Sequence, residues 1–207
     1  MKQRNKRILT PEEESKLYQN SQKESHRDYM LITTTLKLGL RNSEAVTLQR
    51  KHIDLEDNTT HIIDSKNNKD RLVPIPDLLQ DELAYYFKKK EIQDEEDYLF
   101  PSKRRDKHLS TRAFEMKIWK YAVQSNLYPD NITLDNVAYR IPYRERIVPH
   151  SLRHTYATRL LRQGEPMAKV SRLLGHEKVN VTVEIYGHLN VEDLRQTAQT
   201  IEQISTG

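Results

Sequence analysis

The chain has 207 residues, of which 36% are hydrophobic, with 34 lysines and arginines, 30 aspartates and glutamates, and no cysteine. This length suits one domain, or one domain with a small appendage, whose core needs no disulfides. The absence of cysteine excludes cysteine-based metal sites and fits a reducing cytoplasm. No apolar run approaches the roughly 18 residues that span a bilayer, so we expect neither a membrane segment nor a secretory signal.

The first half of the chain predicts helices followed by a small sheet. Thr10 and Pro11 indicate a helix start, since Thr caps free N–H groups and Pro fits the first helical position. Two further helices are predicted over 28–38, ended by Gly39, and over 42–48. Three short segments rich in branched residues then predict an antiparallel meander. They cover residues 52–55, 60–64 and 71–75.

The second half of the chain is predominantly helical in pattern. The predicted helices cover residues 77–90, 110–125, 150–163, 166–174 and 191–203. The segment 128–147 has no clean period and interleaves Tyr with Arg, so it predicts an extended loop or hairpin. Together the elements predict an α+β fold: a mostly helical domain with a small three-stranded antiparallel sheet.

Four residues near the C-terminal end could act on a phosphodiester. Arginine and histidine can hold a phosphate and stabilise its developing charge, and tyrosine can attack it and carry a covalent intermediate. These residues are His150, Arg153, His176 and Tyr186. The first two share a helical face with His154, a pattern that is also typical of an ordinary amphipathic surface helix. Two histidines four residues apart can bind zinc, but no third ligand is evident and an arginine lies between them.

Two residues in the first half of the chain could also act on a phosphodiester. Arg41 directly follows the predicted helix end and could point into a cleft, where Glu44 would orient it; an ordinary surface ion pair is the alternative. Lys66 lies in a turn between two predicted strands. It is either simply solvated or delivered by the turn to a leaving group.

Basic residues are clustered on a chain whose net charge is +4. Any single run is typical of solvated surface, but several runs together favour a nucleic-acid partner. We therefore predict DNA contacts by Lys103, Arg104, Arg105, Arg140, Arg144 and Arg146. Residues 1–9 are predicted to form a basic N-terminal linker.

From about Thr10 to Leu194 these motifs together resemble the tyrosine recombinase (phage integrase) family. G-L-R-N-S-E resembles its first arginine box, and S-K-N-N-K-D-R-L-V-P resembles the hairpin that holds its catalytic lysine. H-S-L-R-H-T-Y, L-L-G-H and V-E-I-Y resemble its later boxes. The resemblance assigns the catalytic set as Arg41, Lys66, His150, Arg153, His176 and Tyr186, supported by Glu44.

The resemblance implies a site-specific DNA recombinase that uses no metal, nucleotide or other cofactor. Tyr186 would attack a DNA phosphate and form a 3′-phosphotyrosyl link, and strands would be exchanged through a Holliday junction. Double-stranded DNA is the implied partner, bound by a homotetramer whose C-terminal helix, 191–203, docks onto a neighbour. The expected setting is the cytoplasm, associated with the nucleoid, in a prokaryote, phage or mobile element.

The resemblance also implies a domain organisation, and it leaves alternative functions open. Residues 10–207 are expected to form the catalytic domain, with an insertion at 128–147 and with the family's core-binding domain absent. The alternatives are a type IB topoisomerase-like enzyme, a hairpin-forming resolvase or a non-catalytic DNA-binding regulator. A zinc-dependent hydrolase is the most distant rival.

Overall fold

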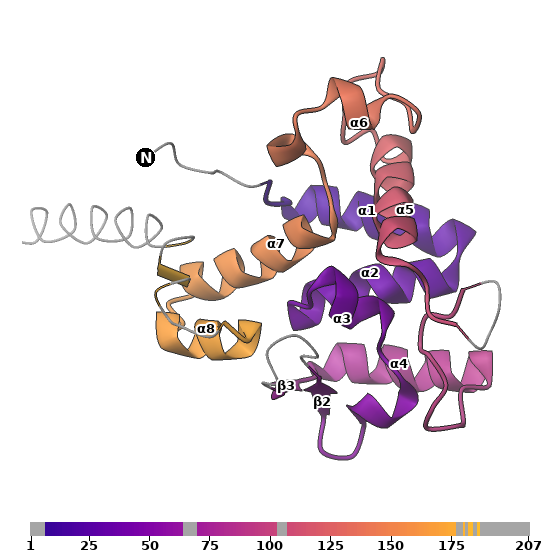
Figure 1. The fold of residues 1–207 in the computed structure, drawn as a ribbon, viewed down its shortest axis with the longest axis vertical. Coiled ribbons are helices and arrows are strands. Elements are labelled where there is room, and N and C mark those ends of the chain that lie inside the picture. Colours follow the sequence, from indigo (N-terminus) through magenta and orange to yellow (C-terminus); the bar gives the residue numbers. More distant parts are fainter. Residues whose placement is uncertain are drawn as a thin grey trace, which may run out of the picture. The chain divides into compact units, whose positions relative to one another are not determined.

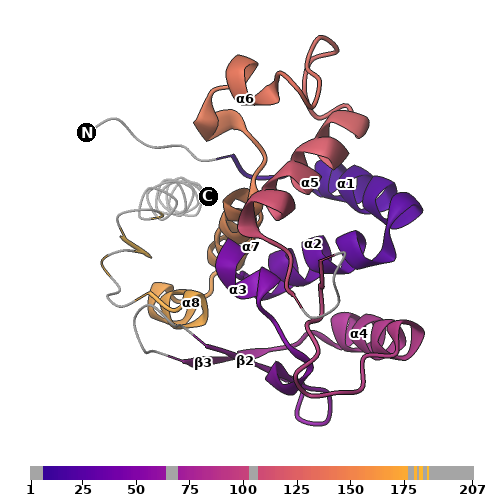
Figure 2. The ribbon, with the colours of Figure 1, turned by 45° about the vertical axis from the view of Figure 1, so that its right-hand side comes forward.

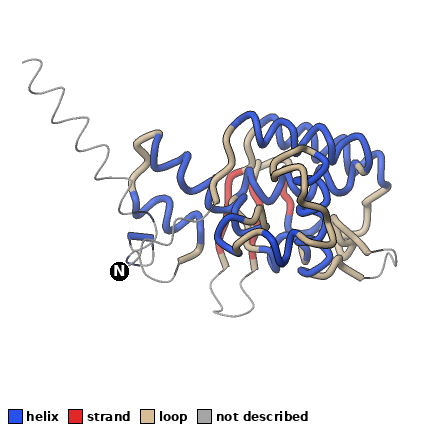
Figure 3. The backbone as a smooth tube through the Cα atoms, turned by 90° about the horizontal axis from the view of Figure 1, so that it is seen from above, coloured by secondary structure: helices blue, strands red, loops and turns tan. Residues whose placement is uncertain are grey.

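A computed structural model describes residues 7–63, 70–102, 107–176, 180, 182–183 and 186. The chain divides after Tyr156 into two compact units, and the division falls within helix α7 (Pro149–Arg162) (Figure 1). Helices predominate and the strands are few and short (Figure 3). None of the helices in the described ranges is both long and apolar enough to cross a membrane.

The first two helices begin at capping side chains. Helix α1 (Pro11–Glu24) starts with a capping box, in which the Glu13 amide donates to Thr10 Oγ1 at 3.3 Å and the Thr10 amide donates to Glu13 Oε2 at 3.0 Å. Helix α2 (His26–Leu38) starts two residues before its predicted start, because Ser25 accepts from the Asp28 amide and serves as the cap. Gly39 ends α2 in the left-handed region, as predicted.

A three-stranded antiparallel sheet in the order β1-β2-β3 confirms the predicted meander. Its strands are β1 (Ile53–Asp54), β2 (Thr59–Ile62) and β3 (Arg71–Pro74), each shorter than predicted. The helix α3 (Asn42–Val46) and the short 3₁₀ turn η1 (Arg50–His52) precede the sheet. Ile62 pairs with Arg71 in the last rung of the β2–β3 ladder, and Lys66 lies between them in the sequence.

Helix α2 is buried along nearly its whole length in the core of the first unit. It packs against α1, α3 and α4 (Asp77–Lys90), and α1 also packs against α5 (Thr111–Gln124) (Figure 2). Neighbours cover several sides of α2, since Met30, Leu31 and Ile32 are successive residues with no exposed surface. Both α4 and α5 match their predicted ranges to within one residue.

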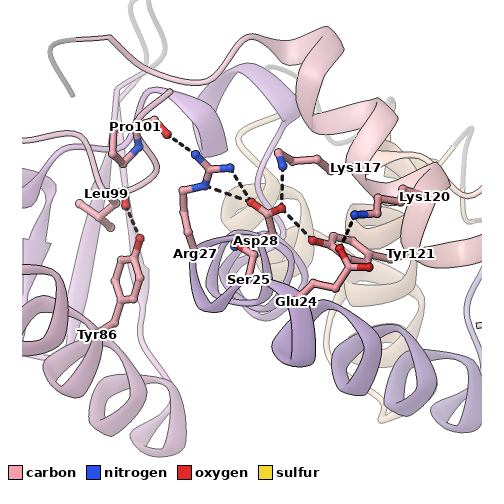
Figure 4. A network of polar contacts seen from close by, with 10 residues as sticks. All are labelled: Glu24, Ser25, Arg27, Asp28, Tyr86, Leu99, Pro101, Lys117, Lys120 and Tyr121. Atoms are coloured by element: carbon pink, nitrogen blue, oxygen red, sulfur yellow. Dashed lines mark hydrogen bonds and ion pairs between the residues drawn. The ribbon is translucent and has the colours of Figure 1, made fainter. Parts of the chain in front are cut away.

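A buried carboxylate fixes the start of α2 to α5 (Figure 4). Asp28 is 2% exposed and accepts from Lys117 Nζ at 2.6 Å, from Tyr121 Oη at 2.8 Å and from the guanidinium of Arg27. Burial raises the pKa of Asp28, but Lys117 and Arg27 outweigh burial and lower that pKa below its ordinary value. Arg27 also donates to the carbonyl of Pro101, so the same network holds the segment that follows α4.

The segment 128–147, all of which the structure describes, is not a hairpin. It contains the short helix α6 (Val137–Arg140) and the 3₁₀ turn η2 (Tyr143–Glu145), and no strand. The guanidinium of Arg146 holds it together by donating to the carbonyls of Ile141 at 2.7 Å and Ala138 at 2.6 Å. A small apolar cluster of Trp119, Ile132, Val137 and Val148 packs beneath it.

The second unit contains the C-terminal half of α7 and the helix α8 (Met167–Leu174). Both helices lie within one residue of their predicted ranges. Gly175, with φ 64°, ends α8 in the left-handed region, and Gly164, with φ 83°, lies in the turn before it. The predicted helix 191–203 lies outside the described residues.

Candidate active site

A buried carboxylate organises the first predicted box. Glu44 lies in the first turn of α3, and its side chain is 5% exposed. Its Oε2 accepts from the Arg41 amide at 2.7 Å, and its Oε1 accepts from Arg41 Nη1 at 2.6 Å. Because Glu44 is buried, this contact is not the ordinary surface ion pair that the sequence left open. The Arg41 side chain remains 30% exposed and can still meet a ligand.

A second arginine, Arg71 at the start of β3, makes a bidentate contact with the same carboxylate. Its Nη1 donates to Glu44 Oε1 and its Nη2 to Glu44 Oε2, both at 2.8 Å. Sequence reasoning missed this residue. The signal was the alternation of β3, in which Arg71 and Val73 occupy the buried positions, because a buried arginine needs a carboxylate partner.

The third arginine comes from helix α7. Arg153 Nη1 lies 3.8 Å from Glu44 Oε2 and donates to the carbonyl of Gly39 at 2.8 Å. The Arg153 side chain is 3% exposed, so this face of α7 is not the solvated face that the amphipathic alternative required. The structure therefore brings Arg41, Glu44 and Arg153 together, as the sequence predicted, and adds Arg71.

The electrostatics of this cluster favour an anion. Three guanidinium groups surround one carboxylate, which leaves an excess of positive charge. Burial raises the pKa of Glu44, but the hydrogen bonds and charge of Arg71, with the charge of Arg153, outweigh burial and hold that pKa at about 2. Glu44 is thus ionised at neutral pH, where it orients the arginines without cancelling their charge.

Gly39 lets the chain pass close to α7. Its φ is 63°, a region that favours glycine, and a Cβ atom there would lie 2.4 Å from Cδ1 of the Tyr156 ring. The position therefore needs glycine both for its backbone conformation and for lack of space. Its carbonyl is the one that Arg153 contacts, so the end of α2 helps to orient the arginine.

His150 and His154 lie one turn apart on α7 in different surroundings. His150 is exposed, whereas His154 is 3% exposed, and their rings meet edge to face with centroids 4.4 Å apart. Within the described ranges, no group of three or more His, Cys, Asp or Glu side chains could hold a metal ion. The exposed His150 is the one of the pair that a ligand can reach.

The second unit holds the two remaining candidates that the structure describes. His176 directly follows the end of α8, and its Nδ1 lies 2.7 Å from Oγ1 of the buried Thr182. That contact orients the imidazole. Tyr186 is 4% exposed.

Several predicted residues have no described position. Lys66 lies in the segment 64–69 and Lys103, Arg104 and Arg105 lie in 103–106, all outside the described residues. Arg140 and Arg144 are exposed, as DNA contacts would be. Arg146 is half-buried, and its guanidinium donates to the backbone carbonyls of Ile141 and Ala138.

Comparison with known proteins identifies the family. The model of the phage integrase family matches residues 7–193, so the chain belongs to that family. A tyrosine recombinase XerA of Thermococcus kodakarensis is 30% identical over 200 residues, which cover 96% of this chain and 64% of that protein. A XerD of Yersinia pestis is 32% identical over 181 residues, or 84% of this chain and 53% of that protein.

Solved structures agree on the fold. A crystal structure of XerA recombinase superposes with a TM-score of 0.72 and 27% identity, covering 93% of this chain and 64% of that chain. The XerH recombinase bound to its difH substrate gives the same TM-score at 22% identity, which shows the fold alone. The chain thus spans less than two thirds of the length of the XerA and XerD relatives.

Proposed function

We propose that residues 10–207 are the catalytic domain of a site-specific DNA recombinase that cleaves and rejoins strands through a phosphotyrosine intermediate. The observation that carries this proposal is the cluster of Arg41, Arg71 and Arg153 around one buried carboxylate, in a member of the phage integrase family. A preorganised group of guanidinium donors suits the charge that develops on a phosphate during transfer.

Two arginines would hold the scissile phosphate. Arg41 is partly exposed, and Arg153 is aligned by Gly39, so each can direct N–H donors at a non-bridging oxygen. Because Glu44 already fixes these side chains, little reorganisation is needed as the pentavalent transition state forms. His176 would add a hydrogen bond to the same phosphate, and the contact with Thr182 supports this by orienting its ring.

Tyr186 would be the nucleophile. Its oxygen forms a bond to phosphorus while the bond between phosphorus and the 5′-oxygen breaks, which leaves a 3′-phosphotyrosyl link and a free 5′-hydroxyl. His150 accepts the tyrosine proton, which is otherwise lost only near pH 10, and Lys66 donates a proton to the departing oxygen. The reverse attack by a 5′-hydroxyl reseals the strand, so the scheme requires neither metal nor ATP.

The proposed partner is double-stranded DNA. Two proteins of similar fold have been solved with DNA: the XerH recombinase bound to a difH substrate and the Tn1549 transposon integrase in complex with transposon right end DNA. The exposed Arg140 and Arg144, and the basic residues in 103–105, supply charge for backbone contacts. From membership of the same family we also propose that four protomers assemble on paired DNA sites, and that the helix predicted at 191–203 docks onto a neighbouring protomer. The proposed setting is the cytoplasm, where the protein would act on nucleoid DNA.

A nicked suicide substrate tests the proposal. Cleavage next to the nick releases a short oligonucleotide, which traps the covalent complex as a slow band on a denaturing gel. The unaltered chain should form that band without added metal, and Tyr186→Phe should bind the same DNA and form none. A band that persists in Tyr186→Phe contradicts the assignment. Relaxation of a plasmid without paired target sites would instead favour a topoisomerase-like enzyme, and DNA binding without any adduct would favour a regulator.

A further inference from the structure

Two tyrosines in the segment 128–147 expose their rings to solvent. Tyr139 in α6 is 87% exposed, and Tyr143 in η2 is 68% exposed. Figures 1 and 2 both draw α6 beyond one end of α5. Tyrosine is enriched where proteins contact their partners, because its ring offers a large apolar face together with a polar hydroxyl. Two exposed rings only four positions apart therefore indicate a binding surface.

The backbone that carries the two rings is held in place by Arg146. Its guanidinium donates to the carbonyls of Ala138, which precedes Tyr139, and of Ile141. Its Cζ atom lies 5.7 Å from the centre of the Tyr143 ring and 5.9 Å from the centre of the Trp119 ring. Both tyrosines are thus attached through one side chain to the buried cluster beneath them. A fixed surface of this kind loses little conformational freedom when a ligand binds.

Positive charge accompanies the exposed rings. Arg140 and Arg144 each directly follow one of the tyrosines, and both are exposed. Glu145 is the one acidic residue in the stretch 139–146, against three arginines. Its Oε1 lies 3.6 Å from Arg144 Nε, and both side chains are more than half exposed, so this contact neutralises little of the charge. The surface therefore suits an anionic ligand that also offers flat faces.

Unpaired DNA combines these two properties. Aromatic side chains stack on the bases of single strands, while arginines hold the phosphates that link them. In a paired duplex the neighbouring base pairs cover the faces of each base, which leaves the rings nothing to stack on. A protein partner could also contact the tyrosines, but the excess of arginine over glutamate favours a polyanion.

We propose that Tyr139, Arg140, Tyr143 and Arg144 form a platform that binds unpaired nucleotides of DNA. Each ring stacks on a base, and each guanidinium contacts a phosphate. This activity goes beyond strand cleavage, and it does not depend on whether the chain cleaves DNA. In the proposed recombinase the exchange of strands would itself supply the ligand, because base pairs must open before the strands can change partners.

Binding to two duplexes of equal length tests the proposal. One duplex is fully paired, and the other has a central run of unpaired thymines; both have the same ends, which cancels any stacking there. The full chain carrying Tyr186→Phe would be titrated with each duplex and followed by fluorescence anisotropy, so that binding is measured without cleavage. It should bind the opened duplex about tenfold more tightly, within the range expected from one or two stacked bases.

Paired substitutions identify the rings as the cause of this preference. Tyr139→Leu combined with Tyr143→Leu should lower the affinity for the opened duplex about tenfold and change that for the paired duplex by less than about twofold. Tyr139→Phe combined with Tyr143→Phe keeps the aromatic faces and should keep the preference. Tyr85→Leu is the matched control, because it removes a ring that is 58% exposed on α4 and should leave the preference unchanged.

The possible outcomes separate the platform from the proposed cleavage. Equal affinity for the two duplexes overturns the platform, even if the unaltered chain forms its covalent adduct. A preference for the opened duplex supports the platform, even if no adduct forms and the proposed function fails. A preference that survives in the double leucine variant, or that is lost in the double phenylalanine variant, overturns stacking by these rings. Self-association that the leucine variant abolishes, without any preference for opened DNA, would make the surface a contact between copies of the chain and also overturns the proposal.

Discussion

The carbonyl oxygen of Gly39 accepts a hydrogen bond from Arg153 Nη1 at 2.8 Å, which links two residues 114 positions apart in the sequence. The left-handed backbone at Gly39 turns the chain at the end of α2, and the ring of Tyr156 fills the space where a side chain would stand. The end of helix α2 therefore helps to orient Arg153 on helix α7, the arginine that is proposed to bind the phosphate.

Gly39→Ala should destabilise the first unit and slow cleavage. The left-handed conformation costs an alanine about 1–2 kcal/mol, and the overlap of its Cβ with Tyr156 adds to that cost. Gly164→Ala is the matched control, because Gly164 also has a positive φ but has no atom within 4 Å of an added Cβ. Urea unfolding should show a clearly larger loss of unfolding free energy for Gly39→Ala. Equal losses would mean that the close approach of Tyr156 is unimportant.

Arg153→Ala should greatly lower the rate of DNA cleavage while leaving the affinity for DNA nearly unchanged. Loss of one preorganised donor to a transition state costs about 10²–10³-fold in rate. Single-turnover cleavage of the suicide substrate measures this effect, with Arg112→Ala as the control for loss of an arginine elsewhere. A rate for Arg153→Ala within about threefold of the unaltered chain would remove Arg153 from the proposed site.

Glu44→Gln should be strongly destabilising because it leaves three arginines around a neutral amide. Removing one partner of a buried ion pair typically costs about 3–5 kcal/mol. Glu115→Gln, which breaks the exposed pair with Arg112, should cost at most about 1 kcal/mol. Chemical denaturation of both variants checks the difference. Similar small costs for the two variants would show that the arginines do not depend on Glu44.

The same carboxylate predicts a pH dependence of stability. The pKa of Glu44 falls from an ordinary 4.5 to about 2 in the fold, so its contribution is fully present above pH 4.5 and is lost as the pH falls toward 2. The difference in unfolding free energy between the unaltered chain and Glu44→Gln should therefore shrink over that window. A difference that stays constant from pH 5 to about pH 2 would contradict the assigned ionisation.

The arginines of the segment 128–147 should divide into two kinds. Arg140→Ala and Arg144→Ala should each lower the slope of log affinity against log salt by about 0.9, as expected for one lost phosphate contact. Arg146→Ala should instead lower the melting temperature, because its guanidinium is bonded to the carbonyls of Ala138 and Ile141. Salt titrations and thermal melts of the three variants check this division. A lowered salt slope without a lowered melting temperature in Arg146→Ala would reverse it.

Local signals in the sequence were sufficient to predict most of the helices. Thr10 and Gly39 define their helix ends by side-chain capping and by left-handed backbone, both of which depend only on neighbouring residues. The pairing of Arg41 with Glu44 was also predictable, because Arg41 directly precedes a short helix and Glu44 lies three positions further on. The order of the family motifs then placed Arg153 in the same site.

Contacts between distant segments were not predictable in this way. Arg71 joins Glu44 across 27 positions, and no local pattern names its partner. The helix α6 within the segment 128–147, which was predicted as an extended loop or hairpin, was not predictable because it has only four residues, too few to show a helical period. The backbone contacts of Arg146 were not predictable either, because its guanidinium donates to carbonyls that an irregular segment leaves open.

The most direct test of the proposed mechanism is to identify the residue that becomes joined to DNA. The covalent complex formed on a suicide substrate would be digested with a protease and a nuclease, and the modified peptide sequenced by mass spectrometry. The proposed mechanism predicts a single peptide in which Tyr186 carries a nucleotide through its 3′-phosphate. A nucleotide on any other residue, or one attached through a 5′-phosphate, would contradict it.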